Sequence, residues 1–460
     1  MHRMALWQKL YYSAMVLTLF LVVIGELIWL PDPLRLGSTI YWIDVIDELI
    51  YVLMLIPLIW IAGSLIHLRS HRRGWMWVRA VSIIAAGLAC VIILLTVPKK
   101  LEYSAGAFIL TWLLVFVDLF VHERIRRKLP MKSISLFAIT VCLMLVMFWP
   151  TKYLVTYPGL TLNMNRYAHT SEGNVHGDIS GVLVFERPAF PIDWVYAKLF
   201  AKYSFEVENL GMTLGEYNQE VRLMKADANA AGSAIAFQKV GKGKGISSSG
   251  VRITAILKDS PASGQIQLGD VIQQVKGQTV TTLEELTERM KTVKPGDQVS
   301  LTVLRGGKQV NVQAKTRPNP DDASRAAFGI QVANEVQYDL PILVNYHDYL
   351  LHEGGPSHGA MLALTLVDQL TPCGVTYGNH VAGTGTMEPD GSIGPVGGLE
   401  QKAYTISRTN ADVFFVPVAN ESEAKKGAPS LQIVPVRTLD DMMKWLKEHP
   451  KQTTGQLSCP

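Results

Sequence analysis

The sequence predicts a multi-pass α-helical membrane region followed by a soluble part, which holds a β-rich module with one or two helices and then a further folded domain. Apolar residue types make up 48 % of the 460 residues and charged types only 18 %, whereas charged residues make up about 25 % of ordinary soluble domains. Five apolar stretches explain this deficit of charge. Each is close to the roughly 20 residues that a spanning helix needs, and they lie at about Leu10–Leu30, Leu49–Leu68, Ala80–Val97, Ala105–Val121 and Ser133–Trp149.

Basic residues between these stretches predict the orientation of the membrane region, because cytoplasmic loops are enriched in Lys and Arg. With the N-terminus inside, the inner segments carry ten basic residues and the outer segments five. Five spans then place everything after Pro150 outside the cytoplasm. The first stretch ends in WLPDPLRLG, which lacks a small-residue cleavage site, so we expect an uncleaved anchor. The sequence therefore predicts a multi-pass protein of the cell membrane with extracytoplasmic domains.

Two acidic residues, Glu26 and Asp118, lie inside apolar stretches. Such residues can form an ion or proton site, or they can face a neighbouring helix near the end of a span. The second interpretation is favoured, because no further acidic or basic residue repeats at helical spacing. A five-helix sensor or transporter is the weaker alternative.

Charge and missing motifs exclude several classes of protein. The 43 basic and 39 acidic residues leave a net charge of +4, which is too balanced to indicate nucleic-acid binding. Four cysteines in 460 residues exclude a disulfide scaffold. The phosphate-binding pattern GxxxxGK[ST] does not occur, so we expect no ATP hydrolysis. No cofactor and no metal ion is expected.

Composition divides the chain into six parts. The Gly-, Lys- and Ser-rich break GKGKGISSSG lies near the start of the β-rich module, and the Pro- and Asp-rich run RPNPDDASRAA follows it. The predicted boundaries are a transmembrane region 1–150, a connecting α/β segment 151–235, the module 236–316, a linker 317–327, a final domain 328–450 and a tail 451–460.

The module combines alternating strands, tight glycine turns and one amphipathic helix, TTLEELTERMKTV. With the motifs Ser260-Pro261-Ala262, Leu268-Gly269-Asp270 and Pro295-Gly296-Asp297, it resembles a PDZ domain of the bacterial protease type. Such a domain binds an extended peptide at an exposed strand edge. The resemblance implies that Ser247–Gly250 form the carboxylate loop and that Gly250, Val251, Arg252 and Ile253 contact the peptide. The alternative is a packing module whose groove is filled by its own linker.

The segment HEGGPSHGAMLALTLVDQL places Ser357 at the start of an apolar helix, after a Gly-Gly-Pro turn. Free backbone N–H groups lie at a helix start and can hold an oxyanion, although a serine there is most often only a helix cap. The second segment, VAGTGTMEPDGSIGPVGGLEQKAYTI, puts Lys402 in a helix after a Gly-rich, apolar hairpin. Burial lowers the pKa of a lysine, and a neutral amine near Ser357 can act as its general base.

The motifs Gly-Gly-Pro-Ser-x-Gly, Gly-Thr-Gly and Gly-Pro-Val-Gly-Gly-Leu-x-x-Lys, with 45 residues from Ser357 to Lys402, resemble the α+β proteolytic domain of the Lon family. The resemblance implies that Ser357 is the nucleophile, Lys402 the base and Thr384 the residue that supports the lysine, with Gly355 and Pro356 shaping the nucleophile loop. The order of the parts resembles the membrane-anchored PDZ–Lon proteases of bacteria, here with extra transmembrane helices.

Two positions depart from that family. His358 stands where a small residue is usual, and Thr386 stands where Lon itself has an acidic residue. A Ser357–His358–Asp348 set is the alternative to the Ser–Lys pair. Adjacent residues on a helix point about 100° apart, so we expect the side chain of His358 to face away from Ser357.

The function that the sequence predicts is an ATP-independent, membrane-bound serine endopeptidase with a Ser–Lys dyad. It would cleave unfolded, membrane or extracytoplasmic proteins, and its PDZ domain would bind the substrate or regulate the peptidase. The expected partners are polypeptide substrates, a PDZ peptide ligand, the lipid membrane and a second copy of the chain, without nucleic acid. The alternative is a non-catalytic, PDZ-containing peptide-binding or adaptor protein.

Overall fold

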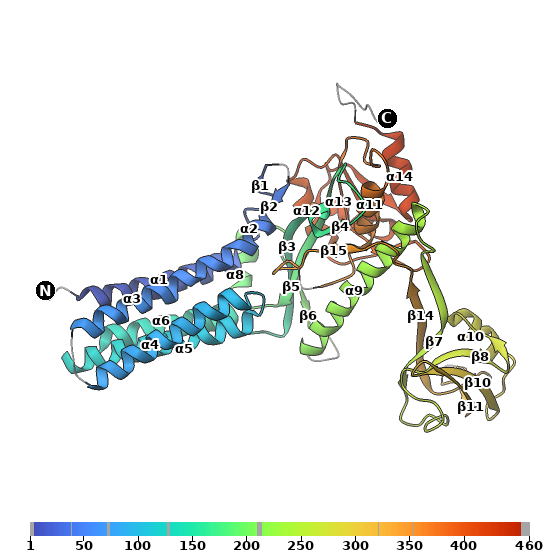
Figure 1. The fold of residues 1–460 in the computed structure, drawn as a ribbon, viewed down its shortest axis with the longest axis horizontal. Coiled ribbons are helices and arrows are strands. Elements are labelled where there is room, and N and C mark those ends of the chain that lie inside the picture. Colours follow the sequence, from blue (N-terminus) through green and yellow to red (C-terminus); the bar gives the residue numbers. More distant parts are fainter. Residues whose placement is uncertain are drawn as a thin grey trace.

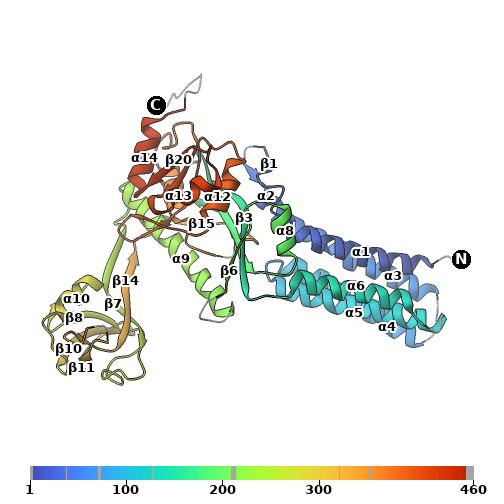
Figure 2. The ribbon, with the colours of Figure 1, turned by 180° about the vertical axis from the view of Figure 1, so that it is seen from behind.

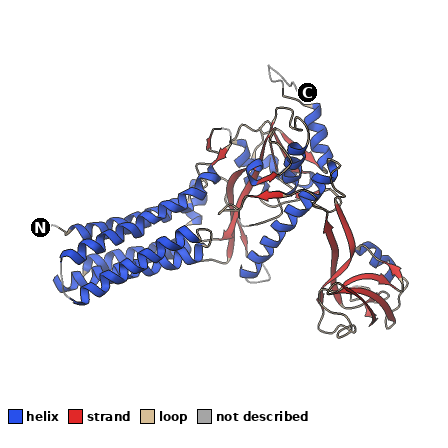
Figure 3. Ribbon diagram, in the orientation of Figure 1, coloured by secondary structure: helices blue, strands red, loops and turns tan. Residues whose placement is uncertain are grey.

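The computed structural model describes residues 4–37, 39–70, 74–126, 129–208, 214–320, 322–352 and 354–451. It has three parts, which follow one another along the longest axis of the molecule (Figure 1). A helical bundle lies at the N-terminal end, a domain around a mixed sheet lies in the middle, and a β-rich module lies at the far end. Figure 2 shows the same order from behind, and Figure 3 shows the strands confined almost entirely to the second and third parts.

The bundle contains the five predicted apolar helices. In the described part of the chain, five helical segments are long and apolar enough to cross a membrane, which agrees with the predicted number of apolar helices. The helices of the bundle are α1 (Leu6–Glu26), α2 (Trp42–Leu49), α3 (Leu55–Ser70), α4 (Gly74–Thr96), α5 (Leu101–Arg126) and α6 (Met131–Phe148), with a 3-10 turn (Ile50–Met54) joining α2 to α3.

Both acidic residues of the apolar stretches pair with basic residues from elsewhere in the chain. Asp118 is fully buried, and its carboxylate lies 3.1 Å from Nδ1 of His67 and 2.7 Å from Nε of Arg79. Glu26 is the last residue of α1, and its Oε2 lies 2.7 Å from Nη2 of Arg187 in the central sheet. The interpretation as contacts with neighbours near span ends therefore agrees with the fold, because the partners come from other elements and not from helical repeats.

The central sheet has the strand order β20-β19-β16-β5-β3-β6. Strands β20, β19, β16 and β5 run parallel to one another. Strand β3 pairs antiparallel with β5 on one side and with β6 on the other. Segment 151–235, which lies before the module in sequence, supplies three of these strands. The bounds are β3 (Tyr153–Asn163), β5 (Asp178–Pro188), β6 (Ser204–Val207), β16 (His380–Gly383), β19 (Val413–Pro417) and β20 (Ile433–Val436).

Helices cover both faces of this sheet. Successive residues of a strand point to opposite faces, so alternate apolar residues of β19 pack on different helices. Val413 and Phe415 share a buried cluster with α11 and α14, whereas Phe414 and Val416 share another with α12 and α13. The long helix α9 packs along α11. The helices are α9 (Leu214–Lys239), α11 (Gly359–Leu370), α12 (Leu399–Ser407), α13 (Glu421–Gly427) and α14 (Leu439–Glu448).

The β-rich module is inserted between α9 and the rest of the central domain. Its sheet has the order β11-β10-β8-β7-β14, and β9 pairs with β8. The edge strand β14 lies in the range expected for the final domain, yet it completes the sheet of the module. The elements are β7 (Ile246–Ile256), β8 (Val271–Val275), β9 (Gln278–Thr279), α10 (Leu283–Met290), β10 (Gln298–Arg305), β11 (Lys308–Lys315) and β14 (Ile330–Tyr338).

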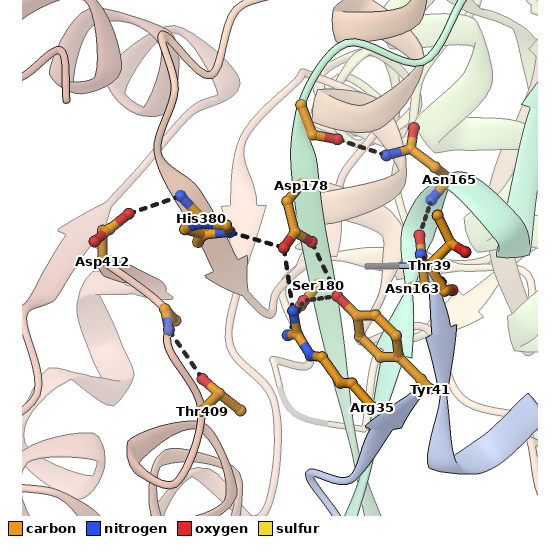
Figure 4. A network of polar contacts seen from close by, with 12 residues as sticks. Arg35, Thr39, Tyr41, Asn163, Asn165, Asp178, Ser180, His380, Thr409 and Asp412 are labelled. Carbon is orange, nitrogen blue, oxygen red and sulfur yellow. Dashed lines mark hydrogen bonds and ion pairs between the residues drawn. The ribbon is translucent and has the colours of Figure 1, made fainter. Parts of the chain in front are cut away.

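Short elements join the bundle to the central domain. The hairpin of β1 (Arg35–Leu36) and β2 (Ile40–Tyr41) follows the first apolar helix. Figure 4 shows Asp178, at the start of β5, between Arg35, Tyr41 and His380. Its carboxylate lies 3.1 Å from Nη1 of Arg35 and 2.8 Å from Nδ1 of His380, and it accepts a hydrogen bond of 2.9 Å from Tyr41. This hairpin is therefore fixed to the amino ends of two parallel strands.

The contacts of Arg187 predict a stability effect. Its guanidinium pairs with Glu26 and with Asp193, which is fully buried. Replacing Arg187 by Met leaves that carboxylate buried without its cation, which costs about 3 kcal/mol or more. We expect thermal unfolding of the detergent-solubilised protein to occur at a clearly lower temperature. Lys425→Met, which breaks an exposed pair with Glu421, serves as the control and should change stability by less than about 0.5 kcal/mol. Equal midpoints for the two variants would contradict this role of Arg187.

Candidate active site

Ser357 lies in the tight turn that leads into α11 and is half-buried. The turn rests on α9: the N–H of Gly355 donates to the carbonyl of Val221 at 3.1 Å. Gly355 has a φ of +95°, which favours glycine. Pro356 then closes the turn, because its carbonyl accepts a hydrogen bond of 3.1 Å from the N–H of Gly359. The Gly-Gly-Pro sequence thus holds Ser357 at the start of a helix, as the sequence predicts.

Thr384 connects the serine turn with the lysine. It follows β16 and is almost fully buried. Its hydroxyl donates to the carbonyl of Ser357 at 3.0 Å and accepts from Nζ of Lys402 at 3.4 Å. The N–H of Gly385 donates to the same carbonyl at 2.8 Å. The fold thus brings Ser357 and Lys402, which are distant in sequence, to the hydroxyl of Thr384.

Lys402 lies in the first turns of α12 and is only 2 % exposed. Gly398 precedes this helix with a φ of +67°, a conformation that few other residues adopt. Burial lowers the pKa of Lys402 from its ordinary value of 10.5 to about 8, because an ammonium ion loses its hydration there. A substantial fraction of the side chain is therefore a neutral amine at mildly alkaline pH, the state that a general base needs.

Two carboxylates oppose this effect, and sequence reasoning missed both. Glu423 and Glu186 each favour the charged form of Lys402. Glu423 also accepts a hydrogen bond of 2.9 Å from the N–H of Leu399 and so caps α12. Glu186 lies in β5, and its own pKa is raised by burial. Glu186 and Glu423 lie outside the motifs around Ser357 and Lys402, so no sequence pattern indicated them.

His358 does not form a Ser-His-Asp set. Its Nε2 lies 2.7 Å from Oδ1 of Asn229 in α9, and its ring packs edge-on against Tyr167. Burial lowers the pKa of His358 to about 3, so the ring stays neutral and is a poor proton acceptor at pH 7. Asp348 is exposed and lies near Lys225 and Lys99. The side chain of His358 therefore links the start of α11 to α9.

The module places the expected peptide-binding residues Gly250, Val251, Arg252 and Ile253 inside its sheet. They lie in β7, which pairs with β8 on one side and with β14 on the other. The resemblance implied an open strand edge at these residues, but Val251 pairs with Asn334 and Ile253 with Val332. The edge strand of the sheet is instead β14. The edge of β7 is thus occupied by β14, which follows the linker in the chain, and this agrees with the alternative of a groove filled from within the chain.

Apolar side chains lie where β14 meets α10. Helix α10 contacts β14, and half-buried side chains from both elements pack on the core of the module, namely Ile330, Val332, Leu283 and Met290. The sequence pattern showed the strands but not their order in the sheet, which depends on pairing between residues about 80 positions apart.

Comparisons with known proteins agree with these two folded parts. A family model described as PDZ domain matches residues 222–316, and one described as Lon protease (S16) C-terminal proteolytic domain matches residues 328–448. The chain thus combines a PDZ domain with a Lon-type proteolytic domain behind a region of apolar helices, and the predicted resemblance and fold class are confirmed.

Individual relatives match over shorter stretches. Lon protease 1 of Myxococcus xanthus is 27 % identical over 186 residues, which cover 39 % of this chain and 22 % of that protein. Lon protease of Rickettsia bellii is 32 % identical over 126 residues, covering 26 % and 16 %. A probable periplasmic serine endoprotease DegP-like of Bartonella henselae is 35 % identical over 119 residues, covering 26 % and 23 %.

The chain spans about a fifth of the length of these relatives. Among solved structures, the PDZ domain of an SdrC-like protein from Listeria innocua is 25 % identical, covers 18 % of this chain and 92 % of that chain, and has a TM-score of 0.17. The family models and the protease relatives together support a serine peptidase in general.

The pKa of Lys402 predicts how peptide hydrolysis depends on pH. If the neutral amine accepts the proton of Ser357, kcat/KM rises with pH, reaches half its maximum near pH 8 and then levels off. Glu423→Gln removes a charge that favours the ammonium form, so the rise should shift to lower pH by up to about one unit. The matched control is Glu421→Gln, which alters an exposed pair with Lys425 and should leave the profile in place. A wild-type profile that is flat from pH 6 to pH 10 would contradict the assignment.

Proposed function

We propose that this chain is a multi-pass membrane serine endopeptidase in which Ser357 and Lys402 form a catalytic dyad. The observation that carries the proposal is the buried Lys402, whose lowered pKa and contact with the hydroxyl of Thr384 put a proton acceptor beside the serine turn. A structural lysine gains nothing from such burial, because hiding an ammonium ion costs several kcal/mol.

The proposed reaction is acyl transfer. Oγ of Ser357 attacks the carbonyl carbon of the scissile peptide bond while Nζ of Lys402 takes the hydroxyl proton. The proton passes to the leaving amine as the C–N bond breaks, which leaves an ester on Ser357. Water then attacks the ester, Lys402 again accepts a proton, and the acid product leaves with the serine restored. The oxyanion would need N–H donors from the turn before α11, because the N–H groups of Gly359 and Ala360 already donate to the carbonyls of Pro356 and Gly385.

We place the PDZ and proteolytic domains on the extracytoplasmic side of the membrane. The twofold excess of basic residues in the inner segments supports this side. We expect hydrolysis without ATP, because the phosphate-binding pattern GxxxxGK[ST] does not occur in this sequence. The proposed substrates are unfolded, membrane or extracytoplasmic polypeptides.

Substitutions in the dyad test the proposal. Ser357→Ala and Lys402→Arg should each lower cleavage of an unfolded protein such as casein by about 10³-fold or more, since arginine stays protonated in proteins. Thr384→Ala should cause an intermediate loss that Thr384→Ser restores. The assay uses the detergent-solubilised full chain, with and without ATP, and the two rates should agree.

His358→Gln provides the control for the dyad, because it keeps a polar partner for Asn229 and should retain most of the activity. Cleavage that survives Ser357→Ala would reject the mechanism. An inert wild-type protein, tested with and without PDZ-binding peptides, would favour the adaptor function.

Peptide binding to the PDZ domain should use the edge of β14. Val332→Asp puts a charge among the apolar side chains where β14 meets α10, so we expect at least a tenfold loss of affinity for C-terminal peptides selected on the full chain. The matched control is Val312→Asp, which changes another half-buried valine on the opposite edge strand β11. Equal losses from both variants, with both folded by circular dichroism, would contradict this peptide site.

A further inference from the structure

A short helix at the membrane end of the central domain exposes apolar side chains. Helix α8 (Asp193–Leu199) lies beside the end of the bundle in both views (Figures 1 and 2). Trp194 is 39 % exposed, Val195 50 % and Leu199 68 %. Asp193 and Tyr196, in contrast, are buried and hold the helix against the domain. The helix is therefore amphipathic, with its apolar side facing away from the protein.

Contacts with two spanning helices fix the height of α8 relative to the bundle. The N–H of Ile192, directly before α8, donates to the carbonyl of Val146 at 3.2 Å, and α6 ends two residues later at Phe148. Asp193 shares Arg187 with Glu26, the last residue of α1. Helix α8 thus begins at the level where two apolar helices end.

Exposed aromatic residues lie at the same level. Trp149, the residue after α6, is 62 % exposed, and Tyr153 is 42 % exposed. Trp194 packs edge-on against Tyr153, with ring centres 5.8 Å apart, and stacks on Phe205 of β6 at 4.8 Å. Trp and Tyr are enriched where membrane proteins cross from hydrocarbon to water. In water, by contrast, an apolar patch of this kind would be unfavourable.

We propose that α8 is an interfacial helix whose exposed face lies in the headgroup region of the same bilayer that the five helices cross. The partner is the phospholipid itself, and the inference rests on the proposed membrane location. Burial of Val195 and Leu199 among acyl chains supplies the attraction, and the exposed Lys198 can extend its ammonium group to the lipid phosphates.

This contact connects the bilayer to the active site through short links. Phe205, on which Trp194 stacks, lies in β6 next to Ser204. The hydroxyl of Ser204 accepts a hydrogen bond of 3.1 Å from Nε2 of Gln401, the residue before Lys402. A bilayer that holds α8 therefore also fixes the height of the Lys402 helix above the membrane, which favours substrates that emerge close to its surface.

Fluorescence quenching on the full chain in phosphatidylcholine–phosphatidylglycerol nanodiscs tests the inference. Single cysteines carrying a bimane label are introduced into a background in which the two free cysteines, Cys90 and Cys142, are replaced by Ala. Leu199→Cys reports on α8. Leu268→Cys in the PDZ domain is the matched control, because Leu268 is also 68 % exposed. Ile92→Cys, 57 % exposed on α4, reports on the spanning region.

Spin-labelled lipids should quench the label at 199 at least threefold more than the label at 268, and aqueous iodide should show the reverse order. Equal quenching at 199 and 268 by both quenchers, with strong lipid quenching at 92, would overturn the interfacial helix while leaving the spanning region intact. Absence of lipid quenching at 92 would overturn the membrane location and, with it, this inference. Neither result depends on proteolysis, so each is separable from failure of the dyad.

Discussion

The burial of Lys402 beside the serine turn is the constraint that the central domain is built to satisfy. A charged amine at this position loses hydration worth several kcal/mol, so the surrounding packing lowers its pKa to about 8. The lysine lies on α12 on one face of the sheet, and Ser357 precedes α11 on the other. Thr384, at the end of β16 between those faces, contacts both. The sheet and its two helix layers thus hold the hydroxyl of Thr384 between the carbonyl of Ser357 and Nζ of Lys402.

One continuous segment relates this site to the other parts of the molecule. Strand β14 forms the edge of the PDZ sheet, and the chain then runs through β15 (Val344–Tyr346) towards the serine turn. On the way, Tyr349 donates to Asp44 at 2.8 Å and the N–H of Leu350 donates to Asp47 at 2.9 Å, both in α2. The edge of the PDZ sheet, the contacts with α2 and Ser357 therefore lie within fewer than thirty residues of one another along the chain. β14 belongs to the PDZ sheet, whereas α8 belongs to the central domain, so the proposed peptide site and the proposed membrane contact lie in different parts of the molecule.

The features predicted from sequence are those encoded locally. The apolar stretches predicted the five apolar helices, and the two Gly-rich motifs predicted the helix starts near Ser357 and Lys402, because each motif fixes its own turn. The features that were missed depend on distant pairing. No local signal placed β14 at the edge of the PDZ sheet, so the peptide site was assigned to β7, which is internal. The effect of Glu186 on Lys402 and the pairing of Glu26 with Arg187 depend on strands and helices that are far apart in sequence and adjacent only in the fold.

The most direct test of the account is to identify the residue that carries the acyl group during turnover. The full chain is mixed with a peptide p-nitrophenyl ester at pH 8, quenched in acid, digested and examined by mass spectrometry. The account predicts the acyl group on Ser357 in the wild-type protein and its loss in Lys402→Arg, although that variant keeps the hydroxyl. An acyl group on another residue, or undiminished acylation of Ser357 in Lys402→Arg, would contradict the dyad.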